Sequence, residues 1–101
     1  MKRYVSLGIS KVRYDEKKRR IVKAEAYEIG NGNIRTRMEL QRGQLMDLAR
    51  LGLSIATIRI KNGCDFDILE AVEPVQMRGN VYLRVKGGEE FGDDLGKLPS
   101  L

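Results

Sequence analysis

The sequence predicts an α+β domain in which one helix packs on a mostly antiparallel sheet of about seven short strands. Three observations favour this fold. Apolar and polar residues alternate over most of the chain, which is the period of a strand, and one segment changes to helical spacing. Gly and Asn, rather than Pro, separate the apolar runs, which is typical of tight turns. With 101 residues, the chain has room for one hydrophobic core.

The first part of the chain is predicted to form three consecutive strands. Alternating apolar residues span 4–14, a polar turn follows at 15–18, and β-branched and aromatic residues predict a second strand at 21–29. The Gly-Asn-Gly-Asn run at 30–33 predicts a tight turn, because both residue types tolerate positive φ. The third strand, 34–40, shows the clearest alternation. Its two faces carry Ile34, Thr36, Met38 and Leu40 on one side and Arg35, Arg37 and Glu39 on the other.

A short helix is predicted at 41–51, where the apolar period changes. Gly52 follows the last periodic residue, at the place where a helix end favours a left-handed conformation. About three turns are too few for a stable isolated helix, so packing on the sheet must stabilise it. The residues at helical spacing are Leu45, Leu48, Ala49 and Leu51.

About four further strands are predicted after the helix. The run 55–60 is rich in β-branched residues and ends at the Lys-Asn-Gly hairpin signal 61–63. A return strand follows at 66–72 and is expected to end at the Glu-Pro pair 73–74. Apolar residues then alternate on both sides of the Gly-Asn pair 79–80, which predicts a final hairpin. Strands this close in sequence prefer antiparallel pairing.

Residues 1–86 are expected to form this single domain, and residues 87–101 an irregular acidic tail docked on it. Four apolar side chains are expected to pin the tail: Phe91, Leu95, Leu98 and Leu101. The tail carboxylates Glu89, Glu90, Asp93 and Asp94 are expected to be solvated, because a Gly-rich segment does not fix their spacing as acid–base catalysis requires.

The composition excludes most catalytic machinery. The chain has no His and one Cys, so it contains no Ser-His-Asp triad, no Cys-His pair, no His-containing zinc site and no internal disulfide. The acidic run 65–70 lacks the glycine of a calcium loop, and Cys64 has no base to activate it. We therefore expect no enzyme, no metal site and no cofactor. No stretch has the continuous apolar residues of a signal peptide or membrane span, so we expect a cytoplasmic protein without a membrane partner.

Positive charge gathers in the first part of the chain. Residues 1–63 hold 15 Lys and Arg against 6 Asp and Glu, whereas residues 64–101 hold 4 against 8. One interpretation is a solvated hairpin tip at 17–20 that protects a sheet edge. A second is pairing between oppositely charged halves, within one chain or between two copies, which favours a homo-oligomer. A third is a surface that binds phosphate.

The third interpretation names five candidate ligand-binding residues. Arg35 and Arg37 stand two apart on one strand face, and their planar guanidinium groups bind phosphate through two parallel hydrogen bonds. Arg59 and Arg84 project away from the apolar side of their strands and would join that face if the strands are neighbours. Tyr82 offers an aromatic ring on which a base could stack. No residue is a candidate for catalysis or for metal binding.

We therefore expect a non-enzymatic binding module that captures a phosphate-bearing ligand, a nucleotide or a small nucleotide signal. Such a module would act as a sensor or as a sequestering protein. The alternative is a protein–protein adaptor or inhibitor in which Arg35, Arg37 and Arg84 meet an acidic partner. A third hypothesis is nucleic-acid binding, for which the signal is weaker because the predicted helix carries only two arginines.

The C-terminal stretch carries a family resemblance. Tyr82-Leu83-Arg84, a polar spacer and then the run 93–101, Asp-Asp-Leu-Gly-Lys-Leu-Pro-Ser-Leu, resemble the ending of a family of small, functionally uncharacterised bacterial and phage-encoded proteins. This chain departs from the family pattern at 85–86, Val-Lys for Thr-Asp, and at Asp94, which replaces Asn. The resemblance implies an ordered tail anchored by Leu95, Leu98 and Leu101, and it fits a sequestering protein of phage or prophage origin. It implies no activity.

Overall fold

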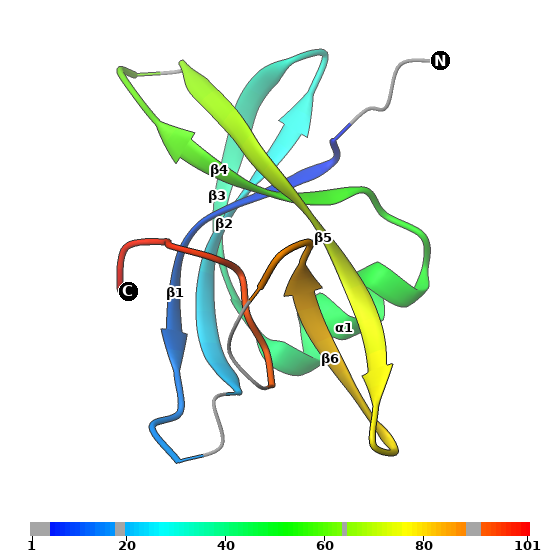
Figure 1. Cartoon of the computed structure of the whole chain (residues 1–101). Coiled ribbons are helices and arrows are strands. Elements are labelled where there is room, and N and C mark those ends of the chain that lie inside the picture. Colours follow the sequence, from blue (N-terminus) through cyan, green and yellow to red (C-terminus); the bar gives the residue numbers. More distant parts are fainter. Residues whose placement is uncertain (1–4, 18–19, 64, 89–91) are drawn as a thin grey trace.

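The computed structural model describes residues 5–17, 20–63, 65–88 and 92–101. Over these residues the chain forms a six-stranded sheet and one helix (Figure 1). The sheet order is β3-β2-β1-β4-β5-β6, and only β1 and β4 are parallel. The elements are β1 (Leu7–Tyr14), β2 (Ile21–Gly30), β3 (Asn33–Gln41), α1 (Arg42–Arg50), β4 (Ile55–Ile60), β5 (Phe66–Met77) and β6 (Asn80–Val85). The predicted α+β class with one helix and a mostly antiparallel sheet is confirmed.

The predicted count of about seven strands is wrong, because β5 runs without a break across Pro74. Pro74 lies opposite Leu83 of β6. The Leu83 N–H donates to the Asp93 carboxylate at 2.9 Å, and its C=O accepts from the Asp94 N–H at 3.0 Å, so both groups point away from β5. Pro74 therefore sits where no hydrogen bond to β6 is required. The pairing of β5 with β4 has already ended at Val72, so the missing N–H leaves the ladder intact.

Helix α1 lies against one face of the sheet and closes the hydrophobic core. At its start, the Gln41 N–H donates to the Gln44 side chain at 2.8 Å, which completes a capping box. Leu45 and Met46 are buried, whereas Leu51, which shares the helical spacing, lies past the last turn and is 78% exposed. Strands from both halves of the sheet supply the rest of the core. It consists of Leu7, Ile9, Val12, Ile21, Ala24, Ala26, Leu40, Leu45, Met46, Ile55, Val72, Leu83, Val85 and Leu95.

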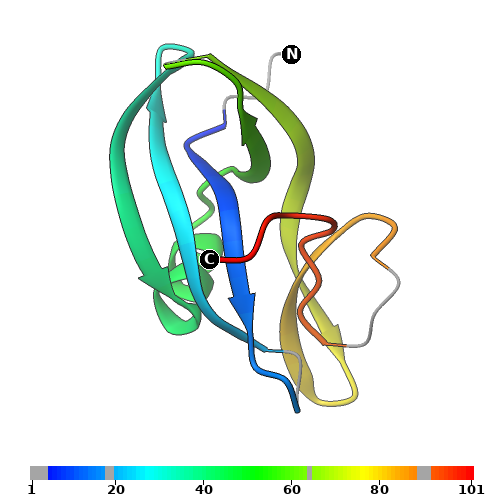
Figure 2. The ribbon, with the colours of Figure 1, turned by 90° about the vertical axis from the view of Figure 1, so that its left-hand side faces the viewer.

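The sheet splits between β1 and β4, and the C-terminal segment fills part of the split. The two strands pair only from Leu7 to Ile9. Farther along β1, the Val12 N–H donates to Pro99 O at 3.1 Å, and the Val12 C=O accepts from the Leu101 N–H. The same segment pairs with β6 through Asp94 and Arg84. Figure 2 shows it, in red, crossing from the β6 side of the domain to β1.

Asp93 fixes the start of this segment. Its side chain is fully buried, which corrects the expectation that the tail carboxylates are solvated; Asp94 is 4% exposed. The Asp93 carboxylate accepts from the Ile21 N–H at 2.8 Å, from the Leu83 N–H at 2.9 Å and from Arg42 Nε at 2.7 Å. Such partners offset the cost of removing a carboxylate from water. One side chain thus joins β2, β6, α1 and the tail.

Arg42 completes this buried ion pair. Its Nη2 donates to Val81 O at 2.6 Å and to Asp93 Oδ1 at 3.2 Å, and its guanidinium carbon lies 5.9 Å from the centre of the Tyr82 ring. Leu95, two residues after Asp93, is 1% exposed in the core, and Leu98 packs against it. Some sequence predictions concern residues outside the described ranges. They are the anchor Phe91, the carboxylates of Glu89 and Glu90, Cys64, and residues 18–19 of the predicted hairpin tip.

We expect Asp93→Ala to lower the free energy of unfolding by about 3–5 kcal/mol, because it leaves a partly buried guanidinium and two backbone N–H groups without their acceptor. Asp47→Ala, on the exposed side of α1, is the matched control and should change stability by less than about 0.5 kcal/mol. Urea unfolding followed by far-ultraviolet circular dichroism measures both. Equal stability of the two variants would contradict a structural role for Asp93.

Candidate functional site

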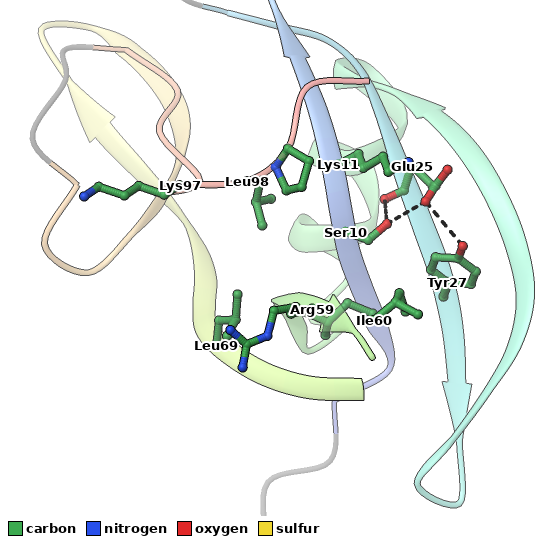
Figure 3. A pocket seen from close by; sticks show the side chains of 11 residues that line it. Ser10, Lys11, Glu25, Tyr27, Arg59, Ile60, Leu69, Lys97 and Leu98 are labelled. Atoms are coloured by element: carbon green, nitrogen blue, oxygen red, sulfur yellow. Dashed lines mark hydrogen bonds between the residues drawn. The ribbon is translucent and has the colours of Figure 1, made fainter. Parts of the chain in front are cut away.

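A pocket of about 510 Å³ lies at the split between β1 and β4 (Figure 3). Strands β1 and β2 line one side, β4 and β5 line another, and the tail closes a third. Its volume is in the range of small-molecule sites. The lining residues are Ser10, Lys11, Glu25, Tyr27, Ile58, Arg59, Ile60, Leu69, Lys97, Leu98 and Pro99.

A break in the β1 ladder places Ser10 in the pocket. The register of β1 with β2 shifts between Ile9 and Lys11, as at a β-bulge, which re-aims side chains and bends a strand. Ser10 is 6% exposed, and the next residue, Lys11, is exposed at the mouth. The bulge therefore lies where β1 turns away from β4 and the pocket opens.

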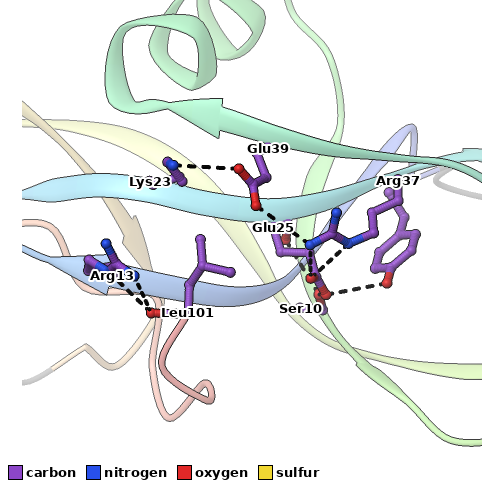
Figure 4. Close-up of polar contacts among 8 residues, drawn as sticks. Ser10, Arg13, Lys23, Glu25, Arg37, Glu39 and Leu101 are labelled. Carbon is purple, nitrogen blue, oxygen red and sulfur yellow. Dashed lines mark hydrogen bonds and ion pairs between the residues drawn. The ribbon is translucent and has the colours of Figure 1, made fainter.

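Ser10, Glu25 and Tyr27 form what we call the polar wall of the pocket. Glu25 is 6% exposed. Its Oε1 accepts from the Ser10 hydroxyl at 2.8 Å and from the Tyr27 hydroxyl at 3.3 Å. Its Oε2 accepts from Arg37 Nε at 2.9 Å and from Arg37 Nη2 at 2.8 Å (Figure 4). Arg37 also lies 3.6 Å from Glu39, which in turn pairs with Lys23, so the network continues across β2 and β3.

The protonation of the polar wall follows from these contacts. Burial by itself raises the pKa of Glu25, but hydrogen bonds from Ser10 and Arg37 and the charges of Arg37 and Lys11 outweigh it, so the pKa lies below its usual value of 4.5. Burial, together with the charge and hydrogen bond of Glu25, raises the pKa of Tyr27. At neutral pH the wall therefore holds one carboxylate and two protonated hydroxyl groups.

Ile58, Ile60, Leu69 and Leu98 form the apolar wall. Ile58 is fully buried and packs where β4 crosses β1. A Cβ at Gly8 would lie 2.7 Å from Ile58 Cδ1 and 3.0 Å from Ile29 Cδ1, so only glycine permits this approach. Leu69 is 42% exposed at the rim. The wall offers contact to a flat apolar surface.

Three cationic side chains lie around the pocket, each from a different segment. Lys11 belongs to β1, Arg59 to β4 and Lys97 to the tail. Arg59 Nη2 lies 2.8 Å from Asp67, which also pairs with Lys61 at 3.1 Å. In the described part of the chain, Lys11 and Lys97 form no ion pair. In Figure 3 Lys97 extends away from the other labelled side chains, which leaves Lys11 and Arg59 as the cations nearest the polar and apolar walls.

The structure does not gather the five residues predicted to bind a ligand. Arg59 lines the pocket, and Arg37 holds the Glu25 carboxylate of the polar wall. The side chain of Arg35, which belongs to β3, lies over Gly30 at the end of β2. Arg84 donates to Gly92 O at 2.6 Å and to Gly88 O at 2.7 Å, and Tyr82 is 5% exposed beneath Arg42. Strands β3 and β6, which carry four of the five, lie at opposite ends of the sheet order.

Sequence reasoning missed most of the pocket. Ser10, Lys11, Glu25 and Tyr27 face it only because β1 and β4 diverge, and this divergence leaves no local pattern. Glu25 also leaves no signal in the sequence, because it alternates with Ala24 and Ala26 as an outward-facing residue of a strand would, although the structure buries it.

Comparison of the chain with protein-family models, with curated proteins and with solved structures finds no match. The family resemblance of the C-terminal stretch therefore stays a prediction. No helix in the described ranges is long and apolar enough to cross a membrane. The case for a function rests on the geometry of the pocket.

We expect Glu25→Gln to destabilise the protein at pH 7 by roughly 1–3 kcal/mol, because the charged hydrogen bonds to Arg37 are lost. The folded-state pKa lies below 4.5, so the native carboxylate adds stability above that pH and loses it as the pH falls further. The difference between wild type and variant should therefore shrink from pH 7 to pH 3 in urea unfolding. Glu28→Gln, at an exposed position of β2, is the control. A difference that stays constant or grows at pH 3 would contradict this role for Glu25.

Proposed function

We propose that this protein is a non-enzymatic binding module whose pocket between β1 and β4 captures a small phosphate-bearing ligand, a nucleotide or a small nucleotide signal. The observation that supports it most directly is the combination of Lys11 and Arg59 with an apolar wall around one cavity of about 510 Å³, which Lys97 also lines through the tail. A nucleotide has the matching parts, an anionic phosphate and a flat base.

Two of the three cations are not neutralised by an ion pair with a described residue, whereas the third, Arg59, pairs with Asp67. Lys11 and Lys97 form no ion pair with another described residue, and Arg59 is 68% exposed while it contacts Asp67. Charge-assisted hydrogen bonds from such groups are stronger than neutral ones. The formal charge of +5 adds long-range attraction for an anion at low salt.

The arrangement fits capture better than turnover. The Glu25 carboxylate accepts four hydrogen bonds or ion-pair contacts from Ser10, Tyr27 and Arg37, and its lowered pKa keeps it ionised at neutral pH. A general acid or base needs a pKa near the operating pH. We therefore propose that the pocket binds and releases its ligand unchanged, as a sensor or a sequestering protein does.

A protein–protein adaptor or inhibitor is the second candidate, and one observation favours it. Ile68 and Leu69 of β5 are 56% and 42% exposed, and among the described residues the part of β5 that carries them pairs with β4 alone. An open strand edge with apolar side chains is a surface to which another chain can add a strand. Co-purification from the native host separates the candidates: a stoichiometric acidic protein supports the adaptor, and a bound ultraviolet-absorbing small molecule supports the pocket.

We expect Lys11→Ala to weaken nucleotide binding about tenfold, the loss that one charge-assisted hydrogen bond predicts. Calorimetry at low salt with nucleoside mono-, di- and triphosphates measures the wild type and the variant. Lys86→Ala removes the same charge at an exposed position outside the pocket and should change affinity less than twofold.

Two results would contradict the proposal. One is the absence of heat with any nucleotide for the wild-type protein. The other is an equal loss of affinity in Lys11→Ala and Lys86→Ala, because net charge rather than the pocket would then account for binding. A fall of about one log unit in affinity per contacted phosphate for each tenfold rise in salt, with DNA or RNA as ligand, would favour nucleic-acid binding.

A further inference from the structure

We propose that the polar wall selects nucleotides whose base carries an exocyclic amine, as in cytosine, over those with a carbonyl at the same place, as in uracil. The inference rests on the proposed function, because it names which base the pocket accepts. It follows from where the protons of Ser10 and Tyr27 are directed.

Both hydroxyl protons of the polar wall are already committed to Glu25. Each hydroxyl has one proton, and the Ser10 and Tyr27 oxygens lie 2.8 Å and 3.3 Å from the same carboxylate oxygen. A hydroxyl prefers an ionised carboxylate to a neutral carbonyl as its acceptor, because the charge strengthens the bond. What Ser10 and Tyr27 offer to the pocket is therefore their lone pairs.

Arg37 stabilises this arrangement. It binds Glu25 Oε2 through two nitrogens, at 2.9 Å and 2.8 Å, and so holds the carboxylate ionised and in place. Glu25, like the two hydroxyl groups, can then only accept. Every side-chain polar atom that the polar wall presents to a ligand is an acceptor, while the cations around the pocket, Lys11 and Arg59 among them, can only donate.

The two parts of the pocket therefore bind different groups of a ligand. The cations bind an anionic group, and the polar wall binds a hydrogen-bond donor. A base suits this pocket better than a sugar, because Ile60 and Leu69 also line it and would pack on the apolar faces of a ring. An exocyclic amine gives two N–H donors, whereas uracil presents a carbonyl oxygen at the same place and its single N–H lies between two carbonyls.

Cytidine and uridine monophosphates test the inference, because they have the same phosphate and sugar and nearly the same size. We expect the wild-type protein to bind the cytidine nucleotide at least about tenfold more tightly in calorimetry, since the carbonyl leaves buried acceptors unpaired. The uridine nucleotide should still bind, weakly, through its phosphate.

Tyr27→Phe connects the preference to the polar wall. This variant keeps the ring and the Arg37–Glu25 pair and removes one acceptor oxygen, so the ratio of cytidine to uridine nucleotide affinity should fall to about threefold or less. Ser10→Ala is the second variant, and Thr36→Val, which removes an exposed hydroxyl outside the pocket, should keep the full preference. Circular dichroism confirms that each variant is folded.

The outcomes separate the two proposals. Equal affinity for both nucleotides, tighter binding of the uridine nucleotide, or a preference that survives in both Tyr27→Phe and Ser10→Ala overturns this inference and leaves the proposed function standing. Absence of binding by either nucleotide and by inorganic phosphate overturns both.

Discussion

The buried ion pair between Asp93 and Arg42 is the contact on which the rest of the structure depends. A carboxylate that is fully removed from water is stable only with compensating donors, and here they come from β2, β6 and α1 together. The tail is thereby fixed at a point between strands far apart in sequence. Its continuation then pairs with Val12, so the C-terminal segment becomes a structural member of the sheet.

The pocket is a consequence of the same arrangement. Strands β1 and β4 pair over three residues and then separate, and the tail enters the split far enough to pair with β1 but leaves the space beside Ser10 open. The absence of a side chain at Gly8 leaves room for Ile58 of β4 and Ile29 of β2 to pack over β1 before β1 and β4 diverge. A wall of acceptors, a wall of apolar side chains and two cations, Lys11 and Arg59, then border one volume, while Lys97 extends away from them. We propose that this combination is the physical basis for capture of a nucleotide.

The sequence indicates most of the local structure and little of the site. Alternation of apolar residues predicts β1, β3 and β6, and β-branched and aromatic residues predict β2 and β4. The change of period predicts α1. These signals arise from each segment's own burial. Pro74 led to the wrong prediction that the strand ends there. A proline is acceptable at this place in β5 only because the backbone groups of Leu83, opposite it, point toward the tail. Asp93 was wrongly predicted to be solvated for a similar reason, because its hydrogen-bond donors lie 72, 51 and 10 residues away in the sequence.

Of the predicted ligand residues, Arg59 reaches the pocket and Arg37 acts on it through Glu25, while Arg84 and Tyr82 belong to the surroundings of the tail.

Native-state hydrogen exchange tests most directly whether the tail is part of the folded core and so a fixed wall of the pocket. The account predicts that the amides of Ile21 and Leu83, which donate to Asp93, and of Val12, which donates to Pro99, exchange only with global unfolding, at the rate of the slowest amides in β2. Fast exchange of these three amides while the centre of β2 remains protected would show that the tail detaches from a domain that is stable without it, and would contradict the account.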